Sequence, residues 1–260
     1  MWNIIKAQNY QTKNDLVVII SLLLFSLATI FSPLLNYPNL SFSEWTGSMY
    51  TVNSEKSFLF FLVLIITTRI CGWDQSDKTI NYEVLVGHSR GSVYAARILA
   101  SFIWIIPVYA ITFFAPIGIC TAINGWGHSA DFSNVILRYL LSLLPLCRLV
   151  CEFAMMTFLL KKGGISTVLG FVIIQGVAMA QAIINSESDF SLTWQFGVSN
   201  CMELWTFEDY SYGYVDGIDV AVFDTALEPS FIVGTTAASL IVGALCLLIG
   251  SVFFKKTDMK

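Results

Sequence analysis

Long apolar stretches separated by short polar segments dominate the chain, and this pattern predicts helices that cross a membrane. A helix crosses the hydrocarbon core of a bilayer with about 20 mainly apolar residues. We therefore predict an all-α polytopic membrane protein whose single transmembrane domain occupies residues 1–260. Its six transmembrane helices are expected at residues 16–35, 58–71 with their flanks, 98–123, 135–160, 167–184 and 231–254.

The composition agrees with a protein whose surroundings are the lipid bilayer. Hydrophobic residues make up 56% of the chain and charged residues only 12%, and the mean hydropathy is +0.70. Soluble domains carry about a quarter of charged residues, roughly twice this share. The net charge of −4 argues against nucleic acid as a partner.

The basic residues are concentrated in alternate segments between the predicted spans, and this distribution predicts the orientation. Cytoplasmic segments of membrane proteins carry an excess of Lys and Arg. The segments that would be external carry only Lys56 and Arg138. With both termini in the cytoplasm, the internal segments carry Lys6, Lys13, Lys78, Arg90, Arg97, Lys161, Lys162, Lys255, Lys256 and Lys260.

Residues 186–230 form a long external segment on this topology. The segment is acidic, contains neither Lys nor Arg, and is rich in aromatic residues such as Trp194 and Trp205. We favour a solvated cap on the last two spans. The alternative is a vestibule that contacts a ligand.

Residues 1–15 precede the first span and form the N-terminal segment. Trp2, Ile4 and Ile5 lie loosely on one helical side, and Lys6 and Lys13 lie among polar residues. This pattern is typical of an interfacial helix on the inner leaflet. A frayed tail is the alternative.

The internal segment 72–97 contains the sequence G-H-S-R-G at residues 87–91, which fits the nucleophile elbow of serine hydrolases. That motif needs a catalytic histidine and a strand before the serine. His88 is the immediate neighbour of Ser89, His128 is expected across the membrane, and alternating strands and helices are absent from the pattern. We therefore expect Ser89 to cap a helix that continues into the third span, after Gly87 has ended a short helix in a left-handed conformation.

No catalytic or metal-binding residues are predicted. The six cysteines form no C-x-x-C pair. Cys147 and Cys151 lie four residues apart in an apolar helical stretch, where small buried side chains are the expected interpretation.

The six spans, the amphipathic N-terminal segment and the loop D-K-T-I-N-Y-E-V-L-V-G-H-S-R-G-S-V-Y-A-A-R together resemble the membrane subunit of an ABC-2 type transporter. The resemblance implies an ABC-2 (type V exporter-like) permease fold in which segment 72–97 contains a coupling helix. It implies that apolar residues of this helix are anchored in a partner ATPase and that its charged residues fix the register of docking. The coupling residues are expected to be Lys78, Ile80, Tyr82, Glu83, Leu85, Ser89 and Arg90.

The partners implied by the resemblance are cytoplasmic ABC ATPase subunits and a second permease, either an identical copy or a related chain. The sequence contains no G-x-x-x-x-G-K-[ST] motif for binding nucleotide phosphates. We therefore expect no cofactor on this chain, with ATP and Mg bound by the separate ATPase. The chain is accordingly predicted to be a transporter subunit and not an enzyme.

The small size resembles the permeases of lantibiotic and bacteriocin immunity and of peptide export. This resemblance implies a multi-pass protein of the bacterial plasma membrane that expels an amphipathic substrate such as an antimicrobial peptide. A sensor or channel subunit that does not use ATP is the alternative. An intramembrane enzyme is disfavoured, because Glu152 has no histidine beside it at membrane depth.

Arg148 and Glu152 lie near the centre of the fourth predicted span at i, i+4 spacing, which allows them to pair. A charge at the centre of a bilayer costs roughly 3 kcal/mol even on insertion scales, so such residues face a partner or a wet cavity. The pair lies on a translocation path or at a dimer seam in one interpretation. In the other it is a mutually neutralised structural pair.

Overall fold

The computed structural model describes residues 1–36, 41–47, 49–76, 80–187, 197–207, 210–215 and 218–256. Helices account for most of these residues, and two strands form a hairpin. In chain order the elements are α1 (Trp2–Asn14), α2 (Leu16–Asn36), α3 (Phe42–Gly47), α4 (Met49–Ser76), α5 (Ile80–Leu85), α6 (Arg90–Asn124), α7 (Phe132–Leu160), α8 (Gly163–Glu187), α9 (Gly197–Trp205), β1 (Tyr210–Val215), β2 (Ile218–Phe223) and α10 (Pro229–Lys256).

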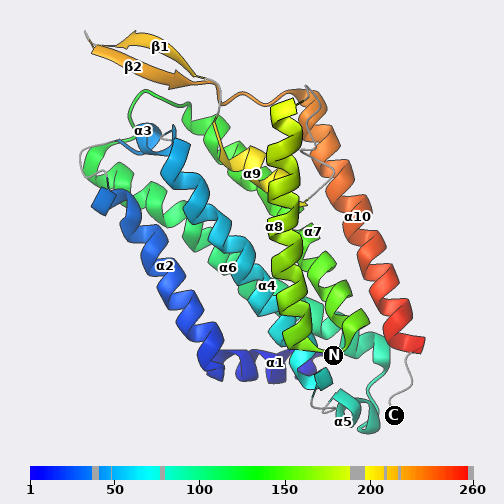
Figure 1. The fold of residues 1–260 in the computed structure, drawn as a ribbon. Coiled ribbons are helices and arrows are strands. Elements are labelled where there is room, and N and C mark those ends of the chain that lie inside the picture. The colour runs from blue at the N-terminus through cyan, green and yellow to red at the C-terminus, as the bar shows by residue number, and fades with distance from the viewer. Residues whose placement is uncertain are drawn as a thin grey trace.

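The long helices run along one common direction, with the short elements at the two ends of the bundle (Figure 1). We call one end the α5 end; it contains α1, α5, the start of α6 and the last turns of α4 and α10. We call the other the hairpin end; it contains α3, β1, β2 and the loops beside them. Helix α9 lies against α7 between the hairpin and the bundle.

The described helices have the length and composition of a membrane-embedded protein. Four of them could cross a bilayer: α6, α7, α10 and the Phe58–Gln75 part of α4. A fifth span results if α1 and Leu16–Thr29 of α2, which meet at a bend of 68°, are counted together. The apolar part of α8 that qualifies, Gly163–Val177, is shorter. Each predicted apolar stretch falls within one helix, and the count of six spans stays a prediction.

The start of α6 confirms two predictions made for the serine motif. Ser89 precedes α6 in an extended conformation, and its hydroxyl accepts a hydrogen bond from the Ser92 N–H at 3.2 Å. Gly87 follows α5 with a φ of +99°, a backbone conformation that residues with a Cβ rarely adopt. Ser89 is therefore a helix cap, as its position in the sequence indicated.

The connection between α4 and α6 is shorter than the predicted loop 72–97. Helix α4 continues to Ser76 and α6 already begins at Arg90. Both helices extend beyond their apolar stretches, because polar residues at a helix end keep their backbone hydrogen bonds as well as apolar ones do. Lys78, one of the predicted coupling residues, lies outside the described residues.

Two hydrophobic clusters hold the helices together. The larger one joins α2, α4, α6, α7 and α9, where the Trp205 ring stacks on Phe60 and contacts Phe113, each at 5.1 Å between ring centroids. The smaller one lies at the α5 end and joins α1, α4, α5, α6, α7 and α10. Its buried members are Ile4, Ile5, Cys71, Ile80, Val93, Tyr94, Ala96, Ile98, Ala154, Phe158 and Phe254.

The predicted external segment differs from a solvated cap. Cys201, Leu204 and Trp205 of α9 are fully buried, and the Trp205 indole N–H donates to the Ser142 hydroxyl at 2.8 Å. Strands β1 and β2 pair antiparallel, and the Phe223 N–H donates to the Ser129 carbonyl at 2.7 Å. The segment thus combines part of the core with a small sheet, which the all-α prediction did not contain.

Candidate functional site at the α5 end

The α5 end is organised around the buried side chain of Arg97 on α6. Its Nη2 lies 2.7 Å from Asp74 Oδ2 on α4 and 3.0 Å from Glu83 Oε1 on α5. Its Nη1 donates to the Ile70 carbonyl of α4 at 2.9 Å. A charge removed from water has to be paired and hydrogen-bonded. Arg97 therefore links three helices through contacts that would be costly to break.

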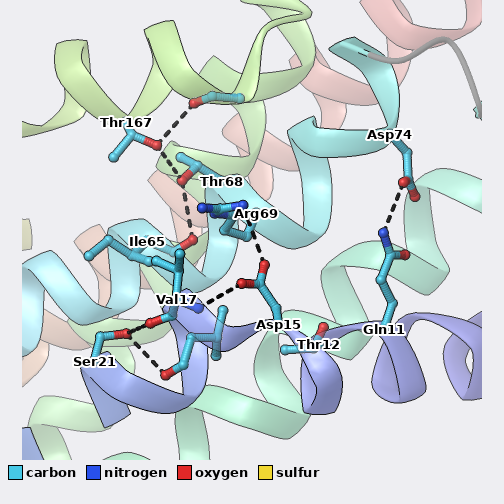
Figure 2. Close-up of polar contacts among 12 residues, drawn as sticks. Gln11, Thr12, Asp15, Val17, Ser21, Ile65, Thr68, Arg69, Asp74 and Thr167 are labelled. Atoms are coloured by element: carbon cyan, nitrogen blue, oxygen red, sulfur yellow. Dashed lines mark hydrogen bonds and ion pairs between the residues drawn. The ribbon is translucent and has the colours of Figure 1, made fainter. Parts of the chain in front are cut away.

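Asp74 extends this connection to the N-terminal helix. Gln8 Nε2 donates to Asp74 Oδ2 at 3.1 Å. Gln11 Nε2 donates to Asp74 Oδ1 at 3.2 Å (Figure 2). Helix α1 also buries Ile4 and Ile5 in the smaller cluster. Residues 1–15 are thus a helix packed on the bundle, which excludes the frayed tail. We call Arg97, Asp74, Glu83, Gln8 and Gln11 the Arg97 network.

The bend between α1 and α2 is fixed on α4 by a second polar contact. Arg69 Nη1 lies 3.4 Å from Asp15 Oδ2, and its guanidinium lies 4.0 Å from the centre of the Trp73 ring. Asp15 also accepts the Val17 N–H at 3.0 Å, so it caps α2 (Figure 2). The bend is therefore held by one carboxylate that serves both α2 and α4.

Helix α5 presents one side to the bundle and its tip to the surroundings. Ile80 is buried, and Glu83 is turned toward Arg97. Leu85 and Val86 at the tip are 78% and 79% exposed. Ile80 and Glu83 thus anchor α5 to its own chain, in place of the partner contacts expected for them. The side chain of Tyr82 lies outside the described residues.

Arg90 makes a contact within its own chain, and its expected contact with a partner stays a prediction. Its Nη1 donates to the Lys255 carbonyl at 2.7 Å, near the end of α10. The last carbonyls of a helix have no intrahelical donor, and a cation beside them is favourable. Arg90 therefore joins the start of α6 to the end of α10.

Arg148 and Glu152 form the ion pair that their spacing predicted. Arg148 Nε lies 2.6 Å from Glu152 Oε1, and the side chains are 4% and 27% exposed. Helix α10 packs closely beside Arg148, because a Cβ added to Gly243 would lie 3.8 Å from the Arg148 Cα. The pair is thus formed within one helix. Its placement on a translocation path or at a dimer seam stays a prediction.

Another buried arginine, Arg138 on α7, organises the hairpin end. Its Nε donates to the Thr225 carbonyl at 2.8 Å, and its Nη2 donates to the Ala226 carbonyl at 3.2 Å. Its Nη1 donates to the carbonyls of Thr206 at 3.2 Å and Glu203 at 3.4 Å. Arg138 therefore fastens the chain on both sides of the hairpin to the bundle.

Sequence reasoning treated Arg97 and Arg138 only as charges that report orientation. Their partners are far along the chain: 23 residues separate Arg97 from Asp74, and 87 separate Arg138 from Thr225. A local pattern therefore could not pair them. The available signal was the presence of Arg and Asp at the edges of apolar stretches, where a charge needs a partner.

The comparisons with known proteins add nothing to the resemblance to ABC-2 permeases, which rests on the loop sequence and the predicted topology. No protein-family model matches the chain, and no curated protein matches it significantly. Within the described parts of the chain, no three His, Cys, Asp or Glu side chains are grouped to hold a metal ion. The α5 end accordingly offers a set of mechanical links between helices and an exposed apolar tip.

Proposed function

We propose that the chain is the membrane-spanning permease subunit of an ABC exporter, and that α5 docks on a separate cytoplasmic ATPase. The exposed tip of α5 carries this proposal. Leu85 and Val86 are two neighbouring large apolar residues that lie almost fully exposed at the end of a helix whose other side is anchored. Exposed apolar residues that adjoin one another mark interaction sites more often than isolated ones do.

The distribution of charge supports a cytoplasmic location for the α5 end. Basic residues are favoured on the cytoplasmic side of a membrane protein. Arg138 is the basic side chain described near the hairpin end. The α5 end and the turn between α7 and α8 carry Lys6, Lys13, Arg69, Arg90, Arg97, Lys161, Lys162, Lys255 and Lys256.

The Arg97 network supports a way for α5 to move the spanning helices. Closure of an ATPase dimer would displace α5 through its tip. Glu83 would pass that displacement to Arg97, and Arg97 would pass it to Asp74 on α4. Asp74 would then move α1 through Gln8 and Gln11. Buried charges keep their partners during such a motion, because an unpaired charge is costly.

Energy and substrate complete the proposal. ATP and Mg would be bound by the ATPase, and a second permease, identical or related, would complete the conduit. The substrate would be amphipathic, such as an antimicrobial peptide or lantibiotic expelled from a bacterial plasma membrane as self-immunity. The small size of the chain supports this substrate class by resemblance alone.

Replacing both tip residues tests the docking of α5. We expect the double variant L85A/V86A to insert normally but to bind the ATPase proposed as its partner at least about tenfold more weakly, because the truncation removes most of the apolar surface that the tip would bury. The measurement is co-purification from membranes, with titration of the purified ATPase. The matched control is I123A/F132A, which truncates two apolar residues, 61% and 52% exposed, near the hairpin end. Unchanged binding in L85A/V86A, or an equal loss in the control, would reject the proposal.

A further inference from the structure

Helices α1, α2 and α6 enclose a groove of about 460 Å³ whose walls are apolar. Val108 forms part of its floor and is buried. Leu23, Ile103 and Ile111 line it with between 45% and 58% of their surface exposed. The walls are formed by residues 22–26 of α2 and 103–111 of α6. In a membrane-embedded helical protein, such a groove faces the acyl chains of the bilayer.

The groove ends in polar groups where α1 crosses it. Lys13 and Asn9 line this end. The Trp104 indole N–H donates to Asn9 Oδ1 at 3.2 Å, which holds the amide in place and leaves its NH₂ group as a donor. Lys13 is exposed and forms no ion pair within the described parts of the chain.

The charge of this polar end is positive because the nearest carboxylate faces elsewhere. Asp15 follows Lys13 by two residues, yet it accepts Arg69 and the Val17 N–H on the α4 side of the bend (Figure 2). Asp15 is absent from the lining of the groove, where Lys13 is the single charged residue. The groove therefore combines a long apolar wall with one cation and one amide donor at its end.

We infer that this groove binds one anionic phospholipid. The phosphate would accept from Lys13 and Asn9, and one acyl chain would lie along the seam between α2 and α6. The bend of 68° between α1 and α2 turns α1 across the bundle and places its polar residues at the end of the apolar walls. A lysine near the membrane surface favours anionic over zwitterionic lipids. This inference needs only the membrane location of the chain and does not depend on an ATPase partner.

A second pocket on the other side of α1 shows why the groove is the better lipid site. This pocket, of about 490 Å³, is lined by Gln8, Tyr10, Arg69 and Trp73 among others. Its cation already pairs with Asp15, which also lines the pocket, so the two formal charges cancel. Its lining also includes the α1 residues Gln11, Thr12 and Asn14, whose side chains interrupt any apolar wall. It therefore has neither the net charge nor the long apolar wall that an anionic lipid requires.

Native mass spectrometry of the full chain tests the inference with phosphatidylglycerol and phosphatidylcholine of equal chain length. We expect the wild-type chain to retain phosphatidylglycerol in preference to phosphatidylcholine. K13A should retain about fivefold less phosphatidylglycerol, with phosphatidylcholine unchanged, because the loss is electrostatic. K13R should behave as the wild type. The matched control is K6A, which removes the same charge from α1 where the ammonium group lies 5.8 Å from the centre of the Trp2 ring.

A second variant tests the groove itself. Ser26 lines the apolar part of the groove, and S26F would fill the space of the acyl chain. We expect S26F to reduce phosphatidylglycerol retention while leaving the helical content unchanged. Equal losses of phosphatidylglycerol in K13A and K6A would show that basic residues attract anionic lipid without a specific site, and would overturn the inference. Unchanged lipid retention in S26F would also overturn the inference of a lipid site. The occupant of the groove would then be a peptide or a second copy of the chain.

Discussion

The two ends of the molecule are each organised by one buried arginine, but the two arginines have different kinds of partner. Arg97 at the α5 end bonds mainly to carboxylates, those of Asp74 and Glu83 on separate helices, and it also donates to the Ile70 carbonyl of α4. Arg138 at the hairpin end bonds to main-chain carbonyls on both sides of the hairpin, including those of Thr206 and Thr225. One arginine thus joins side chains of independent helices, and the other fixes the path of a loop.

This difference indicates different mechanical roles. A carboxylate on a helix moves with that helix, so the Arg97 network transmits a displacement among α4, α5, α6 and α1. Arg138 instead binds carbonyls on both sides of the hairpin, so it holds this stretch of the backbone in one conformation. The guanidinium suits both tasks because it presents five donors in a rigid fork. The comparison therefore predicts a movable α5 end and a fixed hairpin end.

The largest effect is expected for R97M. Removal of the cation leaves the carboxylates of Asp74 and Glu83 beside each other without their shared partner. Breaking a buried ion pair from one side typically costs about 3–5 kcal/mol of the free energy of unfolding. Thermal unfolding of the purified protein in detergent measures the loss. The control R90M removes a partly exposed guanidinium that donates to the Lys255 carbonyl, and it should cost far less. Similar losses in the two variants would contradict the central role of Arg97.

A smaller and more local effect is expected for R138M. The variant loses charge-assisted hydrogen bonds to several carbonyls, which corresponds to about 2–3 kcal/mol for the chain on both sides of the hairpin. Amide hydrogen exchange should rise in residues 197–207 and 218–228, while the helices at the α5 end stay protected. R138K should restore little, since one ammonium group cannot reach carbonyls on both sides of the hairpin. Uniform exchange across the whole chain would contradict the division into two ends.

The smallest effect separates the two carboxylates that bind Arg97. E83Q and D74N each replace one charged hydrogen bond by a neutral one, at a cost of about 1–2 kcal/mol. D74N should raise hydrogen exchange in α1, because Asp74 accepts from Gln8 and Gln11. E83Q should raise it in α5 alone. The same exchange pattern in both variants would show that the network does not divide into an α1 branch and an α5 branch.

The sequence predicted the features that depend on neighbouring residues. Each apolar stretch became one helix, Ser89 caps α6, and Arg148 pairs with Glu152 one helical turn away. Capping and i, i+4 pairing are decided within a few residues, so a local pattern is sufficient. Predicting which α5 side chains point toward the bundle would have required knowing where Arg97 lies in the fold. The outward role expected for Glu83 therefore did not follow from the loop sequence.

The described part of residues 186–230 shows that local patterns also fail to predict packing. Its acidity favoured a solvated cap, and the aromatic residues were treated as part of that cap. In the structure Trp205 has a place between Phe60 and Phe113, with Ser142 as the acceptor for its N–H. These partners come from α4, α6 and α7, so the pocket for the indole exists only once the bundle has formed. Composition averaged over residues 186–230 could not separate the buried helix from its acidic surroundings.

The bond between Arg90 and the Lys255 carbonyl also decides where a label can be attached. It places the end of α10 beside the start of α6, directly after the connection that carries the tip of α5. A bulky fusion partner attached directly after Lys256 would therefore crowd the surface on which an ATPase is proposed to dock. A fluorescent protein at this point is thus expected to mimic a docking defect that a short peptide tag would not produce.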